Sequence, residues 1–334
     1  NDAVQQVKAA LDIVDVIRKY VNLAKKGQNF VGLCPFHSEK SPSFYVSPIK
    51  KIFHCFGCGE SGDVIAFLMK HEHMSFNEVM LQKTQELNIP YIRNSNPQLA
   101  DKLDKIRASL SLLQQQYVQW LSADQQAMHY CDKRHVESTE ISKFGLGAAP
   151  NGNQQLKWLN SNETHIQQLI ETRLFNESKY PLLAHRLVFP IHNSQGIIVG
   201  FSGRDLTNEA NAKYINSPES VVFSKKKILY GLHLAKKSIH STKQVIIVEG
   251  YFDVIAMAKN GFENTVAVMG TALTDFHANQ LSKMCNEVVL MFDSDAAGQN
   301  ATIKSIPALQ QHTLKIKIAQ LGQKDPADFF LDYA

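Results

Sequence analysis

Four potential metal ligands form two close pairs near the start of the chain. Two residues separate Cys34 from His37, and Cys55 and Cys58 repeat this spacing after a longer spacer. A tetrahedral zinc ion is typically held by two such pairs, because each pair lies on a tight turn and the spacer folds back as a hairpin. Four protein ligands leave no open coordination position, so we expect one zinc ion with a structural role. His54 is the alternative to His37 as the fourth ligand.

The remaining cysteines favour a metal site over disulfide bonds. The chain has five cysteines, an odd number, and Cys131 and Cys285 stand alone as predicted free thiols. This pattern is typical of a metal-binding protein in a reducing compartment. Zinc can contribute on the order of 10 kcal/mol to the folding of a small domain. We therefore expect chelation to unfold residues 1–93 selectively.

Carboxylates follow two short apolar segments in the last third of the chain. Glu249 ends one of them, with Asp253 about one helical turn further on, and Asp293 and Asp295 follow the next. Clustered carboxylates repel one another and stay partly protonated unless a divalent cation neutralises them. Oxygen ligands suit Mg²⁺ or Mn²⁺. The sequence therefore predicts a magnesium or manganese site at Glu249, Asp293 and Asp295, and such metals can lower the pKa of a 3′-hydroxyl group and stabilise a leaving pyrophosphate.

Further acids follow a third apolar segment at residues 316–321. Asp325 precedes a proline, and Asp328 lies three positions later. Both extend the predicted acidic site. For Asp253 and Asp328, the simpler alternative is helix capping or solvent exposure.

A basic and polar segment precedes the acidic motifs. Its candidate ligands for nucleotide and template phosphates are Arg186, Arg204, Lys213, Asn216 and Lys225. Cations beside an acidic metal cluster would bind triphosphates. The lysine run that begins at Lys225 would contact a template backbone and make binding depend on salt, although such a run can also be only a solvated surface.

Aromatic residues alternate with basic ones between the two ligand pairs. Rings that stack on bases beside lysines would suit a single-stranded template. The alternative is that most of these rings form the core of a small domain. The residues are Phe44, Tyr45, Phe53, Phe56, Lys50, Lys51 and His54.

Hydrophobic periodicity predicts the elements that position these groups. Residues 3–23 form a predicted helix, and the Gly-, Pro- and aromatic-rich segment after it predicts short strands and turns. Two more helices follow, the first capped by Asp63 and the second by a capping box of Ser75 and Glu78. The Asn-Ser-Asn-Pro sequence at 94–97 breaks the pattern.

The pattern of apolar residues changes twice in the rest of the chain. Residues 101–130 show a helical apolar face, and strand and turn signals dominate from 140 to 235, with a hairpin of 187–191 and 197–201. The helical face consists of Leu103, Ile106, Leu110, Leu113, Tyr117, Trp120 and Leu121. After residue 243, β-branched segments alternate with helix-length segments, which predicts a parallel sheet covered on both faces.

These motifs together resemble the bacterial primase family. Glu249 with Asp253, then Asp293 with Asp295, then Asp325 before proline, is similar to the toprim signature that bacterial primases, topoisomerases and some nucleases share. The zinc cluster and the basic segment stand before it in the order of that family. Two positions depart from the family pattern: Ala327 replaces an acid, with Asp328 one position later, and Lys143 replaces an arginine.

The resemblance implies a multidomain α+β and α/β fold with a zinc ribbon, a mixed α+β subdomain and a toprim parallel-sheet subdomain. The expected domains are the zinc-binding domain (1–93), a linker (94–105), the basic subdomain (106–242) and the toprim part (243–334). It further implies a DNA primase, a DNA-directed RNA polymerase that makes short RNA primers on single-stranded DNA from ribonucleoside triphosphates. Its catalytic residues would be Glu249, Asp253, Asp293, Asp295 and Asp325.

Family members continue into a C-terminal domain that docks on the replicative helicase, so we expect this chain to be a fragment. We also expect a cytoplasmic protein, because no segment reaches the length of a membrane span and the N-terminus lacks a signal-peptide pattern. It is further expected to be a monomer. The net charge of +4 argues only weakly for a polyanionic partner.

The alternative function is a non-catalytic zinc and toprim recombination mediator, but those chains are shorter, and their zinc ligands are typically all cysteine. A topoisomerase would need a nucleophilic tyrosine in a separate domain, and a nuclease would not need the basic segment.

Overall fold

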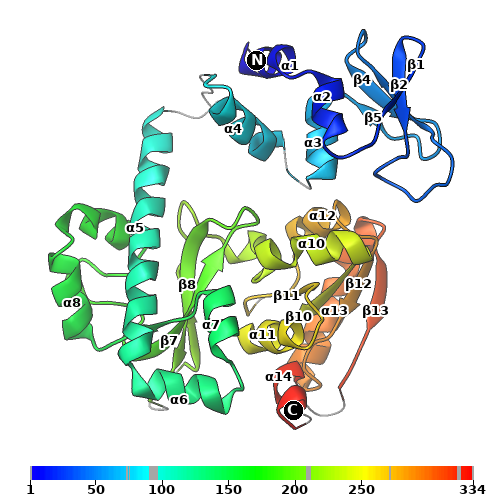
Figure 1. The fold of residues 1–334 in the computed structure, drawn as a ribbon. Helices are drawn as coiled ribbons and strands as arrows, with labels where there is room; N and C mark the ends of the chain where they lie inside the picture. Colours follow the sequence, from blue (N-terminus) through cyan, green and yellow to red (C-terminus); the bar gives the residue numbers. More distant parts are fainter. Residues whose placement is uncertain are drawn as a thin grey trace. The chain divides into compact units, whose positions relative to one another are not determined.

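The structure is a computed structural model that describes residues 2–72, 74, 76–89, 97–207, 212–270, 272–321 and 325–332. The chain divides into two compact units, Asn1–Ser95 and Asn96–Ala334, here called the N-terminal unit and the C-terminal unit (Figure 1). Among the described helices, none has both the length and the apolar character needed to cross a bilayer.

The described residues of the N-terminal unit form a five-stranded antiparallel sheet and four helices. The strands pair in chain order. The helices are α1 (Asp2–Ala10), α2 (Ile13–Arg18), α3 (Val64–His71) and α4 (Phe76–Glu86), and the strands are β1 (Ala24–Lys26), β2 (Asn29–Gly32), β3 (Phe44–Ser47), β4 (Ile52–Cys55) and β5 (Ser61–Gly62).

The predicted single helix over residues 3–23 is wrong, because the chain forms α1 and α2 instead. Asp12 interrupts the helix: its carboxylate accepts hydrogen bonds from the backbone N–H groups of Val14 and Asp15 and so caps α2. The prediction for Asp63 is confirmed, since its side chain accepts from Ala66 N at 2.9 Å at the start of α3. The predicted capping box of Ser75 and Glu78 lies outside the described residues and side chains.

Aromatic rings fill the core of the N-terminal unit. Phe44, Phe53 and Phe67 are fully buried, and the rings of Phe44 and Phe53 stack at 5.3 Å between centroids. The core alternative is therefore confirmed for Phe44 and Phe53. Phe56 is 70% exposed and packs edge-on against the partly exposed Tyr45.

The first half of the C-terminal unit packs helices against an antiparallel sheet of order β6-β7-β8-β9. The helix α5 contacts β6 and β8 (Figure 1). The strands are β6 (Gly147–Ala149), β7 (Arg186–His192), β8 (Ile198–Asp205) and β9 (Tyr214–Asn216). The helices are α5 (Pro97–Ala123), α6 (Gln125–Lys133), α7 (Ser138–Phe144), α8 (Gly152–Asn160) and α9 (Ile166–Glu171), with the 3₁₀ helix η1 (Glu163–His165) before α9.

The predicted hairpin is confirmed, because β7 and β8 pair antiparallel. The helix expected from residue 101 begins at Pro97, so residues 97–105 of the predicted linker are helical, and residues 94–96 lie outside the described part of the chain. This helix ends at Ala123, because Asp124 caps a separate helix by accepting from Ala127 N at 3.0 Å. Helices α8 and α9 fall in a region where the sequence indicated mainly strands and turns.

The second half of the C-terminal unit contains the predicted parallel sheet, of order β11-β10-β12-β13. Successive side chains of β10 enter two different cores: Ile246 and Val248 pack on one face, Val245 and Ile247 on the other. Both faces are thus covered, as predicted. The strands are β10 (Gln244–Val248), β11 (Thr265–Ala267), β12 (Glu287–Leu290) and β13 (Lys315–Ile318). The helices are α10 (Leu232–Thr242), α11 (Tyr251–Lys259), α12 (Asp275–Ser282), α13 (Ala296–Gln311) and α14 (Pro326–Asp332), with the 3₁₀ helix η2 (Lys225–Lys227) before α10.

The strand order makes the ends of β10 and β12 a natural ligand site. From β10 the chain passes to β11 on one side, and it later returns to β12 on the other side. In open parallel sheets, ligands bind beyond the carboxyl ends of the strands where the strand order reverses in this way. Glu249 and Asp293 follow these two strands.

Candidate functional site

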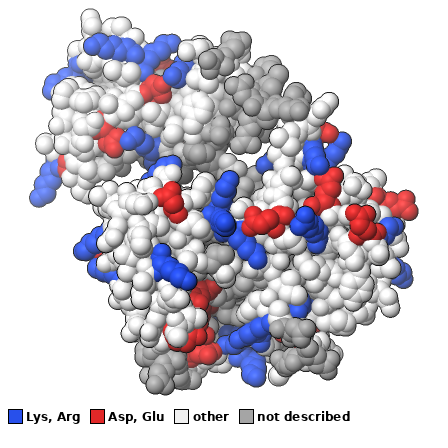
Figure 2. All heavy atoms as spheres, turned by 180° about the vertical axis from the view of Figure 1, so that it is seen from behind, with Lys and Arg blue, Asp and Glu red and all other residues white. Residues whose placement is uncertain are grey.

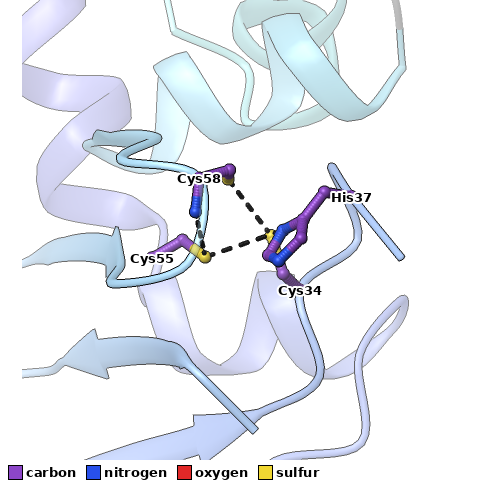
Figure 3. Close-up of side chains that lie close together, drawn as sticks. All are labelled: Cys34, His37, Cys55 and Cys58. Atoms are coloured by element: carbon purple, nitrogen blue, oxygen red, sulfur yellow. Dashed lines mark hydrogen bonds between the residues drawn. The ribbon is translucent and has the colours of Figure 1, made fainter. Parts of the chain in front are cut away.

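The four predicted zinc ligands converge in the N-terminal unit (Figure 3). The potential ligand atoms of Cys34, His37, Cys55 and Cys58 all lie within 4.8 Å of one another. One pair precedes β3, and the other begins at Cys55, the last residue of β4, so the β3–β4 hairpin brings the two pairs together. The alternative ligand His54 lies outside the cluster, with its ring edge-on to Phe56.

The distances within this cluster fit a tetrahedral zinc ion. Tetrahedral bonds of about 2.3 Å to sulfur and about 2.0 Å to nitrogen imply ligand separations of roughly 3.8 Å between two sulfurs and roughly 3.5 Å between sulfur and nitrogen. The Sγ atoms of Cys34 and Cys58 are 3.8 Å apart, and Cys55 Sγ is 3.8 Å from His37 Nδ1. The donor set and its geometry therefore suit one structural zinc ion.

Glu39, which the sequence analysis missed, orients the histidine of the cluster. Its Oε2 lies 3.3 Å from His37 Nε2, and its Oε1 accepts from the backbone N–H groups of Cys34 at 2.7 Å and Ser43 at 3.1 Å. Because Nε2 faces this carboxylate, Nδ1 is left toward the sulfur atoms. Carboxylates in such positions fix the ring and make the histidine a better ligand.

We predict that Glu39→Gln lowers the zinc affinity of the chain by about tenfold, because it removes the carboxylate charge beside His37. Competition with a chromogenic zinc chelator measures the change. Glu60→Gln is the matched control, since Glu60 belongs to the same unit but pairs with Lys70. Equal zinc affinity of the two variants would contradict a role for Glu39 in the metal site.

The acidic residues of the second predicted site meet at the ends of β10 and β12. The backbone N–H of Asp293 donates to Glu249 Oε1 at 3.1 Å, which fixes the two loops together. Asp295 caps α13 by accepting from Gly298 N at 2.8 Å. Oδ1 of Asp293 is buried and has no hydrogen-bond partner among the described residues. An acceptor left without a donor in an acidic environment suits a bound cation.

Burial and repulsion between neighbouring carboxylates raise the pKa values of acids in this cluster. Burial, together with the charges of Glu249, Asp325 and Asp295, raises the pKa of Asp293 to about 6. Burial also raises the pKa of Glu249. These carboxylates disfavour one another's ionised form, and a divalent cation would reverse that effect. Glu249, Asp293 and Asp295 can therefore hold Mg²⁺ or Mn²⁺.

Asp253 has a different environment from the other acids. It is 5% exposed, and its two oxygens accept from Gly250 N at 2.8 Å and Ala327 N at 3.1 Å. These bonds tie the start of α11 to α14. Burial, followed by the charge of Asp325, raises the pKa of Asp253 to about 7. The position is that of a buried cap, the simpler alternative for this residue, and its catalytic role stays a prediction.

The last acidic motif contacts α6. Asp325 accepts from Asp328 N at 2.6 Å at the start of α14, and the Asp328 carboxylate pairs with Arg134 at 2.6 Å. Ala327 is buried and offers only its backbone N–H to Asp253. Which of these carboxylates completes a metal site stays a prediction. The sequence analysis missed Arg134, because its partner Asp328 lies 194 positions away in the chain.

Arg204 lies at the wall of a cavity of about 460 Å³ next to this acidic motif. It is 8% exposed, and its guanidinium lies between the rings of Tyr130, at 5.4 Å, and Tyr214, at 5.3 Å. Its Nε and Nη1 are buried with no partner among the described residues. Lys133, Arg134 and Asp328 line the same cavity. A phosphate group would supply the acceptors that Arg204 lacks.

The other predicted phosphate ligands lie in different environments. Arg186 is buried, and its Nη1 donates to the carbonyl groups of Gly203 and Ala212. Asn216 accepts from the hydroxyl of Tyr251 at 2.6 Å, which connects β9 to α11. Lys213 is exposed. For all of these residues, binding of nucleotide or template stays a prediction.

Lys225 is partly buried, and its backbone N–H donates to Glu219 at 2.8 Å. On the face drawn in Figure 2, basic and acidic side chains are interspersed over each unit, and the described atoms show no single continuous basic patch. Phosphate contacts on this face would therefore depend on particular residues rather than on a uniformly basic surface. Template binding by Lys225 stays a prediction.

Comparison with known proteins identifies the family. A CHC2 zinc finger model matches residues 1–98, a model of the DNA primase catalytic core N-terminal domain matches residues 115–236, and a Toprim-like model matches residues 246–330. The Aquifex aeolicus primase crystal structure (zinc-binding and RNA polymerase domains) is similar over 99% of this chain and 82% of that chain, with 35% identity and a TM-score of 0.66. The chain belongs to the bacterial DNA primase family. The predicted family and fold class are thereby confirmed.

DNA primases of two bacteria are similar to nearly the whole chain. The Clostridium acetobutylicum protein is 38% identical across 98% of this chain, and the Staphylococcus aureus (strain COL) protein is 37% identical across 99%. This chain spans 56% and 57% of their respective lengths. A DnaG primase catalytic domain bound to single-stranded DNA matches 70% of this chain and 76% of that chain, with 30% identity and a TM-score of 0.64.

Proposed function

We propose that this chain is a DNA-directed RNA polymerase that synthesises short RNA primers on single-stranded DNA. The observation that carries the proposal is the order of three primase domains along the chain, with the acidic cluster of Glu249 and Asp293 at the sheet edge of the third. The division of the C-terminal unit into a basic subdomain up to residue 242 and a toprim part from residue 243 belongs to this proposal.

In the proposed reaction, the 3′-oxygen of one ribonucleotide attacks the α-phosphorus of the next, and the bond to pyrophosphate breaks. Mg²⁺ or Mn²⁺ held by Glu249, Asp293 and Asp295, with Asp325 nearby, would lower the pKa of the attacking hydroxyl and neutralise the leaving group. Alternatively, Glu249 would accept the hydroxyl proton as a general base instead of holding a metal, a role that suits the pKa raised by its burial. Asp253 holds α11 against α14 and so keeps the acidic loops in register.

Phosphate groups of the incoming nucleotide would bind Arg204. The two tyrosine rings hold its guanidinium in place, so little side-chain freedom is lost when an anion binds. Lys213 and Lys225 would contribute mobile charges, and Asn216, fixed by Tyr251, would donate a hydrogen bond without adding charge. Arg186, buried at the start of β7, would support the neighbouring strand β8, which carries Arg204, through its hydrogen bond to the Gly203 carbonyl.

The N-terminal unit would contact the template. The exposed ring of Phe56 packs against the partly exposed Tyr45, and the ammonium of Lys26 donates to the Tyr45 hydroxyl at 2.9 Å. Aromatic faces beside cations suit unpaired bases and phosphates. We further propose that the enzyme acts as a monomer at the replication fork in the bacterial cytoplasm, with the replicative helicase as partner through a C-terminal domain outside this chain.

Primer synthesis tests this proposal directly. The chain is incubated with single-stranded DNA, labelled ribonucleoside triphosphates and Mg²⁺ or Mn²⁺, and the products are resolved by size. We expect short, alkali-labile products that require the template and the divalent cation, and none with deoxyribonucleoside triphosphates alone. Salt-sensitive DNA binding without any RNA product would contradict the polymerase proposal and favour a non-catalytic DNA-binding protein.

We predict that Gly298→Ala lowers the rate of primer synthesis by about 100-fold, the effect of misplacing a catalytic group by about 1 Å. A Cβ atom at this position would lie 2.8 Å from Glu249 Oε1 and would also contact the backbone oxygen of Asp293, so the acidic loops must move. Ala297→Gly is the matched control, because it disturbs the same turn of α13 at an exposed position. Similar activities of both variants would contradict the proposed role of this loop.

A further inference from the structure

A second cavity, of about 360 Å³, lies in the C-terminal unit apart from the acidic cluster. Its walls come from α5, the β7–β8 turn, the segment before α10, and α12. Its base is apolar and buried, with Val199, Phe223 and Leu232 among the residues that line it. The volume is within the range of sites that hold small organic ligands.

Two polar groups of this cavity are buried without partners among the described residues. They are the Nε of Arg107, a donor, and the Oε1 of Gln280, an acceptor. Nη1 of Arg107 donates to Asp104 at 3.0 Å, whereas its Nε is buried and has no acceptor among the described residues. Buried polar atoms are normally satisfied, and a bound ligand with both an acceptor and a donor would satisfy these two.

The cavity also combines a flat ring with positive charge. The ring of Phe276 is 46% exposed, and the ammonium of Lys227 lies 5.7 Å from its centroid. Of the described residues that line the cavity, Arg107 and Lys227 are charged, and both are basic. A ligand that fits must therefore present an aromatic face, an anionic group and a hydrogen-bonding edge.

We propose that this cavity binds a nucleotide, with its base against Phe276, its phosphate near Lys227 and Arg107, and the base edge at Gln280. The choice of a nucleotide rests on the proposed function, in which both ribonucleoside triphosphates and a DNA template are at hand. A free ribonucleotide and a nucleotide of the template strand share this chemistry. The site is distinct from the acidic cluster, because none of its lining residues belongs to that cluster.

Photo-crosslinking tests this site with two probes. The chain is irradiated with 8-azido-ATP, or with an oligothymidylate that contains 5-iododeoxyuridine, at concentrations below saturation, and the adducts are mapped by mass spectrometry. We expect adducts on residues 220–229 or 275–283. Adducts with 8-azido-ATP alone assign the cavity to a free nucleotide, and adducts with the oligonucleotide alone assign it to the template.

Three variants decide whether the cavity itself is responsible. Phe276→Leu keeps an apolar side chain but removes the stacking face, and Lys227→Gln removes the charge. Each is expected to lower the adduct yield roughly tenfold, the loss expected for one base–aromatic stack or one phosphate contact. Lys283→Gln, at an exposed position at the end of the same helix, is expected to leave the yield unchanged.

Failure of this inference is distinguishable from failure of the proposed function. Primer synthesis measured on the same preparations, with no adduct on either segment, overturns the nucleotide site and leaves the polymerase intact. Adducts that survive both Phe276→Leu and Lys227→Gln also overturn the site. Adducts that both variants remove support the site even where no primers are made.

Discussion

Replacing Asp293 by alanine is expected to lower the rate of primer synthesis on the order of 10³-fold or more, the kinetic equivalent of several kcal/mol of lost metal-dependent stabilisation. The charges of Glu249, Asp325 and Asp295 all raise the pKa of Asp293, so this residue lies close to the other acids of the cluster. Its Oδ1 has no hydrogen-bond partner among the described residues. Its removal therefore takes a ligand from the centre of the cluster. Labelled ribonucleotide incorporation at saturating nucleotide measures the loss.

The same substitution is expected to stabilise the folded protein when divalent metal is absent. Burial and neighbouring charges raise the pKa of Asp293 to about 6, above the value of about 3.9 in an unfolded chain. The folded state thus binds more protons than the unfolded state between about pH 4 and pH 6, and this group lowers stability as pH rises through that window. Asp293→Ala removes the penalty, so its melting temperature should exceed that of the wild type more at pH 8 than at pH 4.

Glu263→Ala is the matched control for both effects. Glu263 is an exposed acid of the same unit that pairs with Lys143 at 2.8 Å, outside the cluster. We expect it to keep nearly full activity and to show no such gain of stability at pH 8. If Asp293→Ala keeps more than about a tenth of the wild-type rate, the loss falls short of that expected for a metal ligand, and the proposed metal site is wrong.

Features that depend on neighbouring residues could be predicted from the sequence. The pairs Cys34/His37 and Cys55/Cys58 each lie within one tight turn, and the hairpin between them needs only local strand pairing. The parallel sheet was also predictable, because its β-branched segments are separated by helix-length segments. The acids at Glu249 and Asp293 then follow from strand ends that meet at one edge.

Features that depend on distant contacts could not be predicted in this way. Glu39 is an ordinary surface acid in the sequence, and only the folded knuckle turns it toward His37. Arg134 and Asp328 meet because α6 and α14 come together from opposite ends of the C-terminal unit. The sandwich of Arg204 between Tyr130 and Tyr214 likewise joins three separate elements.

Apolar periodicity also failed where a polar residue competes for the backbone. Residues 3–23 keep a helical apolar spacing, yet Asp12 caps a new helix, because a carboxylate that accepts two backbone N–H groups offsets the helical bonds lost there. The same competition at Asp124 separates α5 from α6. Capping residues inside an apolar pattern were the signal that could have predicted both breaks.

Removal of zinc is expected to unfold the N-terminal unit and leave the C-terminal unit folded. Zinc can contribute on the order of 10 kcal/mol to such a domain, and the cluster ties the two ends of the β3–β4 hairpin whose rings form the core. Both tryptophans of the chain, Trp120 and Trp158, belong to the C-terminal unit. Cys34→Ser should therefore lower the far-ultraviolet circular dichroism signal while the thermal transition followed by tryptophan fluorescence stays unchanged.

Cys285→Ala is the matched control for Cys34→Ser, because it removes a thiol that is not a predicted zinc ligand. Cys285 is buried in the core of the C-terminal unit, and its Sγ donates to the Leu281 carbonyl at 3.4 Å, so its replacement should keep the zinc content of the wild type. A Cys34→Ser protein whose N-terminal unit melts as in the wild type would show that the aromatic core suffices without metal. Loss of both transitions together would show instead that the two units fold as one, because a change confined to the zinc cluster would then have reached the tryptophans.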